Sequence, residues 1–455
     1  MGYMNLWKST SVDFCQGGSS HIACHWWARY PGGPCPGSLL CCINNMVFDS
    51  KAYLGELATN QPRIAYLQRE AWPKPLAGAA RVGCTVIAQS PWPPSREQDK
   101  VMGPWLRTAI QGGQDAVVAA ACAPGAANAV EHVVLFAARS DNLNLFHHME
   151  DIFYLFLEAW MYPDQAAVAK GVELVVTDRN GAGWFLELWR RLSYPHPLRI
   201  LHDNPFPPGT CFKHAITHGR GPRSLLTQLG VGTMTRCRSL PLHAMRVWLH
   251  ALTAEVRPEF YTFSAGQHIL DDSYRVAHIV YLSRKAHEAL LGRQTTGFQR
   301  ARITTNEEEL LAGMHQAVTD WNKGSCMLSS NKEGCRDLPV VFRLEDMDPS
   351  LTRFFPEQLS TMSRANVLIG VHGAGMMQQI WMPPEASCVV EVMHNVAGNN
   401  HYHNVAQMLG QDYFQVASGG PKVDVERSVV ALKRCMEAVA PKLAALPLAQ
   451  SRKAL

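Results

Sequence analysis

The sequence lacks the cysteine spacing of a structural zinc site. Thirteen cysteines are present, but none forms a short Cys-x-x-Cys pair, and the adjacent Cys41 and Cys42 are poorly spaced as ligands. Five cysteines lie in the first 42 residues, and Cys326 and Cys335 form a further close pair. Disulfides made in an oxidising lumen are the better explanation of both groups. The odd total leaves at least one free thiol, and Cys388, in an apolar run, is predicted to be one.

Long uncharged apolar runs are also missing. Residues 116–138 come nearest to a membrane span, but a Pro-Gly pair, Glu131 and His132 interrupt them. Residues 1–13 lack the apolar core of a signal peptide. No Asn-x-Ser/Thr glycosylation acceptor occurs in the chain, which is a weak argument against secretion.

Charge is scarce as well. Charged residues make up 18% of the chain, the formal net charge is +4, and no basic block occurs. This balance gives no support to a nucleic-acid-binding function, but it is compatible with a local positive pocket for a diphosphate. Hydrophobic residues make up 47% of the 455 residues, so packed cores are expected, and two domains are favoured over one.

Apolar runs typical of buried strands alternate with helical patterns, which predicts an α/β fold with parallel sheets. No internal repeat is visible. Strands are expected near residues 132–138, 173–177, 199–202, 211–216, 277–285, 339–345, 367–371, 388–392 and 413–416. Helices are expected near residues 142–160, 184–192, 240–255, 356–363, 401–409 and 423–443, with another that begins after Asn306 as its N-cap.

The stretch from Asn366 to Val392 joins two buried strands through a glycine-rich turn. Gly370, Gly373 and Gly375 allow a tight turn and a close approach of a ligand to the main chain. A helix is predicted to begin at about Gly375 or the next residue, and its N-terminus would form an anion site for a phosphate.

Two polar side chains in this stretch are candidates for binding. His372 lies on the turn and can donate a hydrogen bond to a phosphate oxygen. Glu391 is a carboxylate inside an apolar strand, which is unusual unless it meets a sugar hydroxyl or a charged partner such as a buried arginine. A Gly-x-Gly turn after a strand also occurs where it only joins strand to helix. The glycine spacing here does not match the Gly-x-Gly-x-x-Gly fingerprint, which argues against a Rossmann-type oxidoreductase.

The stretch VLIGVHGAGMMQQIWMPPEASCVVEV closely resembles the C-terminal signature of the family 61 glycosyltransferases. These include plant β-1,2-xylosyltransferases of N-glycans, xylan-modifying transferases and O-GlcNAc transferases of the secretory pathway. NLFHHMED (144–151), CFKHAI (211–216) and the arginine-bearing segment 277–310 resemble the family again, and the first two lean toward the xylosyltransferases. Met376 and Met377 depart from the Leu-Thr that relatives commonly carry after Gly-Ala-Gly, so the phosphate-site hydroxyl is in doubt.

The resemblance implies a GT-B fold, in which two Rossmann-like domains face each other across a cleft and a C-terminal helix braces the first. The expected divisions are a Cys/Gly-rich lead-in (1–40), an acceptor-side domain (41–256), a nucleotide-sugar domain (257–420) and the C-terminal helix (421–455). It also implies the Golgi or endoplasmic reticulum lumen and a type II membrane anchor, which this sequence does not show.

The donor-binding residues follow from the resemblance and from chemistry. A planar guanidinium binds two phosphate oxygens at once, so Arg284, at a strand end, and Arg302 are expected to hold a diphosphate; each has a surface salt bridge as its alternative. Glu391 is expected at the ribose hydroxyls. The remaining donor-site candidates are Asn306, Gly370, His372, Gly373, Ala374 and Gly375.

The base that takes the acceptor proton is expected from the first domain. His147 and Asp151 share a helix face at i and i+4, and Asp151 in a partly apolar cleft is the first candidate, with His147 the second. In the alternative reading, the two side chains pair and brace the helix tip. His148 and Glu150 are expected to be solvated.

A metal site is not expected. No Asp-x-Asp motif lies between apolar strands, and the nearest candidates, Asp271-Asp272 and Asp346/Asp348, are expected in polar loops. Metal-independent catalysis without a cofactor is therefore favoured, and the resemblance implies inversion at the anomeric carbon.

The expected activity is transfer of a sugar from a UDP-sugar to a glycan or glycoprotein acceptor, with xylose the first candidate and N-acetylglucosamine the second. A non-catalytic protein of the same fold that binds glycans or nucleotides is the alternative.

Overall fold

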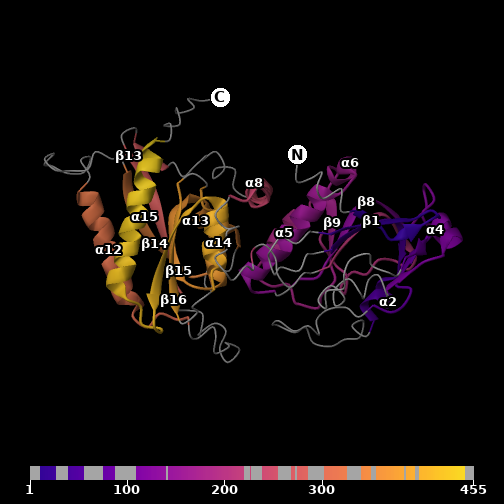
Figure 1. Cartoon of the computed structure of the whole chain (residues 1–455), viewed down its shortest axis with the longest axis horizontal. Helices are drawn as coiled ribbons and strands as arrows, with labels where there is room; N and C mark the ends of the chain where they lie inside the picture. Colours follow the sequence, from indigo (N-terminus) through magenta and orange to yellow (C-terminus); the bar gives the residue numbers. More distant parts are fainter. Residues whose placement is uncertain are drawn as a thin grey trace. The chain divides into compact units, whose positions relative to one another are not determined.

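The computed structural model divides the chain into two compact units, residues 1–227 and 228–455, each of which carries a sheet and helices (Figure 1). This arrangement confirms the predicted α/β class. The described residues are 11–26, 39–55, 75–87, 109–139, 142–219, 226, 238–254, 268–271, 274–284, 302–324, 340–349, 355–383, 386–394 and 399–445.

The first unit, as far as it is described, is built on a nine-stranded mixed sheet in the order β1-β3-β4-β11-β8-β9-β10, with β5 on β4 and β7 on β5. The four strands from β11 to β10 are parallel, and β4 runs antiparallel to β11. The strands are β1 (Ser11–Asp13), β3 (His21–Trp26), β4 (Leu39–Phe48), β5 (Ala80–Val82), β7 (Ile110–Gln111), β8 (Ala129–Ala137), β9 (Val172–Val176), β10 (Arg199–Ile200) and β11 (Thr210–Gly219). A small pair is formed by β2 (Cys15–Gln16) and β6 (Thr85–Val86).

The helices of this unit are α2 (Ser50–Leu54), α4 (Asp115–Ala121), α5 (Leu145–Met161), α6 (Gln165–Val168) and α7 (Leu186–Ser193). The longest, α5, begins where Asn144 accepts a hydrogen bond from the Phe146 amide at 3.0 Å, as an N-cap does. The core contains an aromatic cluster in which the ring centroid of Phe48 lies 5.0–6.5 Å from the ring centroids of Phe136, Phe206 and Phe212.

The second unit has a six-stranded sheet among its described residues, in the order β12-β13-β15-β16-β17 with β14 also on β13. All pairs are parallel except β12–β13. The strands are β12 (His268–Asp271), β13 (Tyr274–Leu282), β14 (Val340–Met347), β15 (Ala365–Val371), β16 (Cys388–His394) and β17 (Asp412–Ser418). The helices are α8 (Leu240–Ala254), α12 (Glu307–Lys323), α13 (Phe355–Arg364), the 3₁₀ helix η7 (Ala374–Trp381), α14 (His401–Leu409) and α15 (Val425–Ala445).

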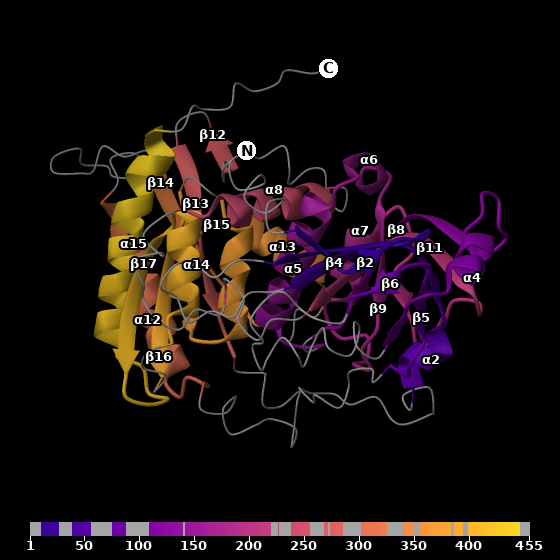
Figure 2. The same cartoon turned by 45° about the vertical axis from the view of Figure 1, so that its right-hand side comes forward.

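Helices cover both faces of this second sheet (Figures 1 and 2). The pair α12 and α15 lies along one face, and α13 and α14 lie along the other. The apolar side chains of α15, including Leu432, Val439 and Leu443, pack into the core of the second unit itself. The C-terminal helix therefore buries its apolar face in the core of its own unit.

The division between the units falls earlier than the expected boundary at residues 256/257. The reason is the packing of α8, which belongs with the second unit. The Ser239 amide donates to the Met408 carbonyl at 2.9 Å, and the His250 ring lies 5.7 Å from the Trp381 ring.

Disulfides join distant segments inside each unit. Those among the described residues are Cys15–Cys84, Cys24–Cys41 and Cys122–Cys211 in the first unit and Cys388–Cys435 in the second. The predicted pair of Cys326 and Cys335 lies outside the described residues.

The prediction that Cys388 is a free thiol is wrong, because α15 brings Cys435 to within 5.5 Å of it between Cα atoms. Cys42 is instead the free, buried thiol of the described part. Burial, with a smaller effect of Glu158, raises the pKa of Cys42 to about 12, which keeps it protonated and unreactive.

Among the residues that the structure describes, no helix has the length and apolar character needed to cross a bilayer.

Glu158 of α5 provides a test of the first unit. Burial raises the pKa of this carboxyl well above its ordinary value of 4.5. Above pH 4.5 the unfolded chain releases a proton that the folded chain keeps, so this group lowers stability as the pH rises. We expect Glu158→Gln to raise the unfolding temperature at pH 8 by about 2–4 °C, with little gain at pH 4.

The measurement is thermal unfolding at the two pH values, with Glu437→Gln as the control because Glu437 is exposed on α15. An equal change at pH 4 and pH 8 would contradict a protonated, buried Glu158.

Candidate functional site

The carboxyl ends of three parallel strands meet in the second unit, at the edge where α/β sheets bind ligands. The strand ends β13 and β14 are level, because Leu282 pairs with Met347 in register and the Ser283 amide donates to the Met347 carbonyl at 3.0 Å. Gly370 of β15 pairs with Leu282 on the other side. Whatever follows these strands is therefore gathered in one place.

The two predicted phosphate-binding arginines converge on the glycine turn. A Cβ placed on Gly373 would lie 2.2 Å from Nη2 of Arg284 and 2.9 Å from Nη1 of Arg302. Both guanidiniums thus lie against the main chain at a position where only glycine leaves room. The φ of Gly373 is +153°, which also favours glycine. The structure brings these three sequence-predicted residues together.

The convergence brings two positive charges close together. The two guanidinium nitrogens lie within about 5 Å of each other, a spacing at which like charges repel. Burial lowers the pKa of Arg284, while Tyr402, Asp348 and Tyr281 nearby act in the opposite direction. An arginine keeps its charge in proteins, so the arrangement favours a ligand with two or more negative oxygens.

Contacts at the start of α12 position Arg302. Glu307, in the first helical turn, accepts a hydrogen bond from the Ser283 hydroxyl at 2.6 Å and also interacts with the Tyr281 phenol. These bonds attach the segment before α12 to the end of β13. Arg302 and Arg284 are thereby supported by the same strand.

Asn306 is engaged within the protein. Its side-chain oxygen accepts from the Val423 amide at 2.9 Å, and its amide donates to the Val423 carbonyl at 3.0 Å. It precedes α12 as predicted, but it does not cap the helix with its side chain. In this geometry it joins α12 to the segment before α15.

The turn itself differs from the predicted α-helix N-terminus. The residues after Gly373 form the 3₁₀ helix η7, and the Met376 amide is already bound to the Gly373 carbonyl at 2.8 Å. Ala374 and Gly375 are partly exposed, whereas Met376 and Met377 are fully buried. A 3₁₀ helix has poorer hydrogen-bond alignment than an α-helix, so the arginines carry more of the positive field than the sequence suggested.

His372 and Glu391 form a buried pair. Nδ1 of His372 lies 2.5 Å from Oε1 of Glu391, and their side chains are 2% and 0% exposed. The other oxygen of Glu391 accepts a hydrogen bond from the Tyr413 hydroxyl. The partner of Glu391 is thus a histidine, and neither the ribose contact nor the buried arginine considered from the sequence is needed to account for its burial.

Four further residues of this site were not predicted from the sequence. Tyr402, at the start of α14, lies edge-on to His372 with ring centroids 5.1 Å apart, and His403 stacks on Tyr413 at 4.4 Å. Asp348 directly follows β14 and is buried beside Arg284. The expectation that Asp346 and Asp348 share a polar loop is wrong, since Asp346 is exposed within β14. In the sequence, the Asp-x-Asp spacing from Asp346 was the feature that could have pointed to Asp348. No sequence pattern pointed to the two tyrosines.

No group of three or more His, Cys, Asp or Glu side chains within the described ranges is arranged to hold a metal ion. The side chain of Asp271 and all of Asp272 lie outside the described part of the chain.

In the first unit, the candidate residues lie in the first turns of α5. His147 binds Glu150 through its Nδ1 at 2.8 Å, and its side chain is 24% exposed. Asp151 is 2% exposed. The expectation that His148 and Glu150 are solvated is wrong, because both are buried. Nδ1 of His148 accepts from Nε1 of Trp189 at 2.9 Å, and burial lowers the pKa of His148 to about 3.

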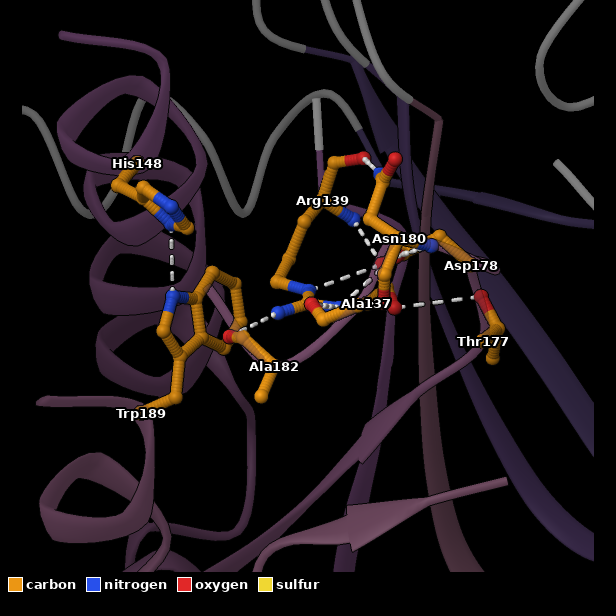
Figure 3. A network of polar contacts seen from close by, with 9 residues as sticks. Ala137, Arg139, His148, Thr177, Asp178, Asn180, Ala182 and Trp189 are labelled. Atoms are coloured by element: carbon orange, nitrogen blue, oxygen red, sulfur yellow. Dashed lines mark hydrogen bonds and ion pairs between the residues drawn. The ribbon is translucent and has the colours of Figure 1, made fainter. Parts of the chain in front are cut away.

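A buried ion pair stands beside this helix start (Figure 3). Arg139 follows β8 and Asp178 follows β9; Nη2 of the arginine lies 3.0 Å from Oδ1 of the aspartate, with both side chains fully buried. Arg139 also donates to the carbonyls of Asn180 and Ala182, and the Asn180 side chain returns a bond to the Arg139 carbonyl at 3.1 Å. The loop after β9 is therefore fixed to the end of β8.

A family model described as Glycosyltransferase 61 matches residues 145–390, more than half of the chain and a range that runs from α5 through the glycine turn to β16. A search of curated proteins gives no match.

The buried ion pair makes a prediction about stability. Asp178→Asn leaves the Arg139 charge without its carboxylate, and breaking a buried pair in this way costs about 3–5 kcal/mol. We expect a corresponding fall in the free energy of unfolding of the first unit, measured by urea denaturation. Glu187→Gln, which breaks exposed pairs with Arg190 and Arg191, is the control and should change stability by less than about 0.5 kcal/mol.

Equal losses in Asp178→Asn and in the control would show that the buried pair does not support the loop.

Proposed function

Because the chain belongs to glycosyltransferase family 61, we propose that it moves a sugar from a UDP-sugar to a hydroxyl group of a protein-linked glycan or polysaccharide. Xylose is the first candidate for the sugar, since the segments 144–151 and 211–216 lean toward the xylosyltransferases. N-Acetylglucosamine transferred to a protein hydroxyl is the second.

The observation that carries the proposal is the convergence of Arg284 and Arg302 on the main chain of Gly373. Two guanidiniums at the carboxyl edge of a parallel sheet match the charge and the spread of a diphosphate. They can also stabilise the charge that develops on the diphosphate as it leaves, which is the main electrostatic demand of the reaction. The position of the two arginines favours a mechanism in which they neutralise the diphosphate, as a metal cation does in other glycosyltransferases.

In the proposed reaction, the acceptor oxygen attacks the anomeric carbon from the side opposite the diphosphate. A new carbon–oxygen bond forms, the bond from the anomeric carbon to the phosphate oxygen breaks, and UDP leaves with the bonding electrons. The configuration at the anomeric carbon is inverted by this single displacement. The acceptor proton passes to a base, for which His147 and Asp151 are the candidates.

Of the two candidate bases, His147 is the more accessible. Its side chain is 24% exposed and is held through Nδ1 by Glu150. Asp151 is 2% exposed in the first unit. We therefore place His147 before Asp151, in the reverse of the order suggested by the sequence.

The same proposal includes a GT-B arrangement of the two units and a place in the Golgi or endoplasmic reticulum lumen. Four disulfides among the described residues support an oxidising compartment, because cytosolic proteins rarely keep them.

Donor binding can be tested by thermal shift without added divalent ions. We expect UDP to stabilise the protein by about 2.7 kcal/mol at a hundredfold excess over its dissociation constant. Arg284→Ala and Arg302→Ala should each weaken UDP binding about 10–100-fold, because each removes a charge-assisted hydrogen bond. Hydrolysis of UDP-xylose and of UDP-N-acetylglucosamine, compared in the same preparation, then identifies the sugar.

Stabilisation by ADP but not by UDP would contradict the donor assignment, and a strict need for a divalent cation would contradict the role given to the arginines.

The glycine turn gives a second test. In Gly373→Ala, the new methyl group would displace the Arg284 guanidinium, and the positive φ adds backbone strain of about 1–3 kcal/mol. We expect UDP binding to fall at least about 10-fold, which corresponds to one lost charge-assisted contact. Gly419→Ala is the control, because a Cβ at Gly419 meets nothing within 4 Å.

Retention of full UDP affinity in Gly373→Ala would show that the turn does not lie at the diphosphate.

A further inference from the structure

The second sheet carries different chemistry on its two faces. Side chains alternate between faces along a strand, and Val390 and Val392 of β16 lie in the core beneath α12 and α15. Glu391, between them, must point to the opposite face. Phe414 and Val416 of β17 likewise pack with that core, so their neighbour Tyr413 shares the face of Glu391.

The strand register explains why these two residues meet. Val389 pairs with Tyr413, and Glu391 pairs with Gln415, so Glu391 and Tyr413 are diagonal neighbours on adjacent strands. Diagonal neighbours on one face are within reach of long side chains. Accordingly, the Tyr413 hydroxyl donates a hydrogen bond to Oε2 of Glu391.

His372 approaches Glu391 from the neighbouring strand. Its amide donates to the Val392 carbonyl at 2.8 Å, which fixes its backbone beside β16. Its Nδ1 lies 2.5 Å from Oε1 of Glu391. Each carboxylate oxygen of Glu391 is therefore bound by a different side chain, and the residue is 0% exposed.

We infer that Glu391 and Tyr413 are positioning residues, which hold the His372 ring with Nδ1 turned inward and Nε2 presented to the diphosphate of the bound nucleotide. This inference rests on the proposed function and assigns Glu391 a role through His372 in place of a contact with ribose. The Nδ1–H group of His372 donates to one oxygen of the Glu391 carboxylate, and the Tyr413 hydroxyl donates to the other. Both carboxylate oxygens therefore have a hydrogen-bond donor.

The surroundings of Tyr413 and His372 restrict the ring further. Burial, followed by the nearby Glu391, raises the pKa of Tyr413, so the phenol remains a neutral donor. His403 stacks on Tyr413 and Tyr402 lies against the His372 ring, both from the start of α14. In metal sites, a carboxylate that binds one ring nitrogen of a histidine fixes the orientation of the ring for the ligand at the other nitrogen, and the Glu391–His372 pair has the same form.

A purely structural role is the weaker explanation. Burying a carboxylate costs free energy that a well-packed apolar residue would avoid, and the gain from a buried pair seldom exceeds that cost. Such a group in the centre of an apolar strand is better explained by what it does for His372, which is the residue next to Gly373 and the arginines.

The experiment measures UDP dissociation constants by calorimetry for the full chain and for Tyr413→Phe, Glu391→Gln and His372→Ala, alone and combined. Tyr413 touches no nucleotide in the proposal, yet Tyr413→Phe should weaken UDP binding about 3–10-fold, the effect of one lost neutral hydrogen bond. Glu391→Gln should weaken it about 10–100-fold, by analogy with the partners that orient metal-binding histidines. In the His372→Ala background, both changes should have less than about a twofold further effect, because they act through that ring.

A second measurement separates positioning from ribose binding. The ratio of the dissociation constants for 2′-deoxy-UDP and UDP should be the same in Glu391→Gln as in the unaltered protein. If Glu391 bound the 2′-hydroxyl, that ratio would fall toward one in the variant, and the positioning role would be overturned. Comparison with 3′-deoxy-UDP tests the other hydroxyl in the same way.

Tyr162→Phe is the matched control. It likewise removes one tyrosine hydroxyl that is bound to a side chain, here Nδ1 of His214 at 2.8 Å in the first unit. UDP affinity should not change in this variant. If Glu391→Gln fails to fold, Tyr413→Phe, which loses a single hydroxyl, gives the same test alone.

The outcomes distinguish the two proposals. Failure of the unaltered protein to bind UDP overturns the proposed function and the positioning role with it. Binding of UDP with fully additive losses in the combined variants overturns the positioning role only.

Discussion

Two positive charges held against one glycine are the constraint on which the second unit depends. Arg284 and Arg302 approach the main chain of Gly373 more closely than any residue with a Cβ would allow. Arg284 follows the end of β13, and Arg302 lies in the segment before α12, which Glu307 attaches to β13. In the proposed function, this pair of positive charges binds the leaving diphosphate.

The residues around the arginines complete this edge of the sheet. Glu307 attaches the segment of Arg302 to β13, and Asp348 places a carboxylate beside Arg284. Across the turn, Glu391 is enclosed by a histidine and a tyrosine. Glu391 is thus occupied by His372 and Tyr413, whereas the carboxylate beside Arg284 is that of Asp348.

The first unit uses buried polar contacts for a different purpose. The Arg139–Asp178 pair fixes the loop after β9 to the end of β8, and the Trp189–His148 bond fixes α7 to α5. The second contact restricts the first turns of α5, where His147 and Asp151 lie. In the proposed reaction, it would help to hold the candidate base in place.

The sequence by itself determined most of the order of strands and helices from β8 onward, because apolar periodicity is a local property, but it did not predict the strands before β8. It also indicated Gly373 and Arg284, since a glycine turn and an arginine at a strand end are visible as residue types in order, and the family resemblance added Arg302. Only the tertiary structure decided which side chains meet. The Cys388 disulfide, the place of Asp348 and the enclosure of Glu391 by His372 and Tyr413 depend on strand register and helix packing, which join residues far apart in the chain and leave no local pattern.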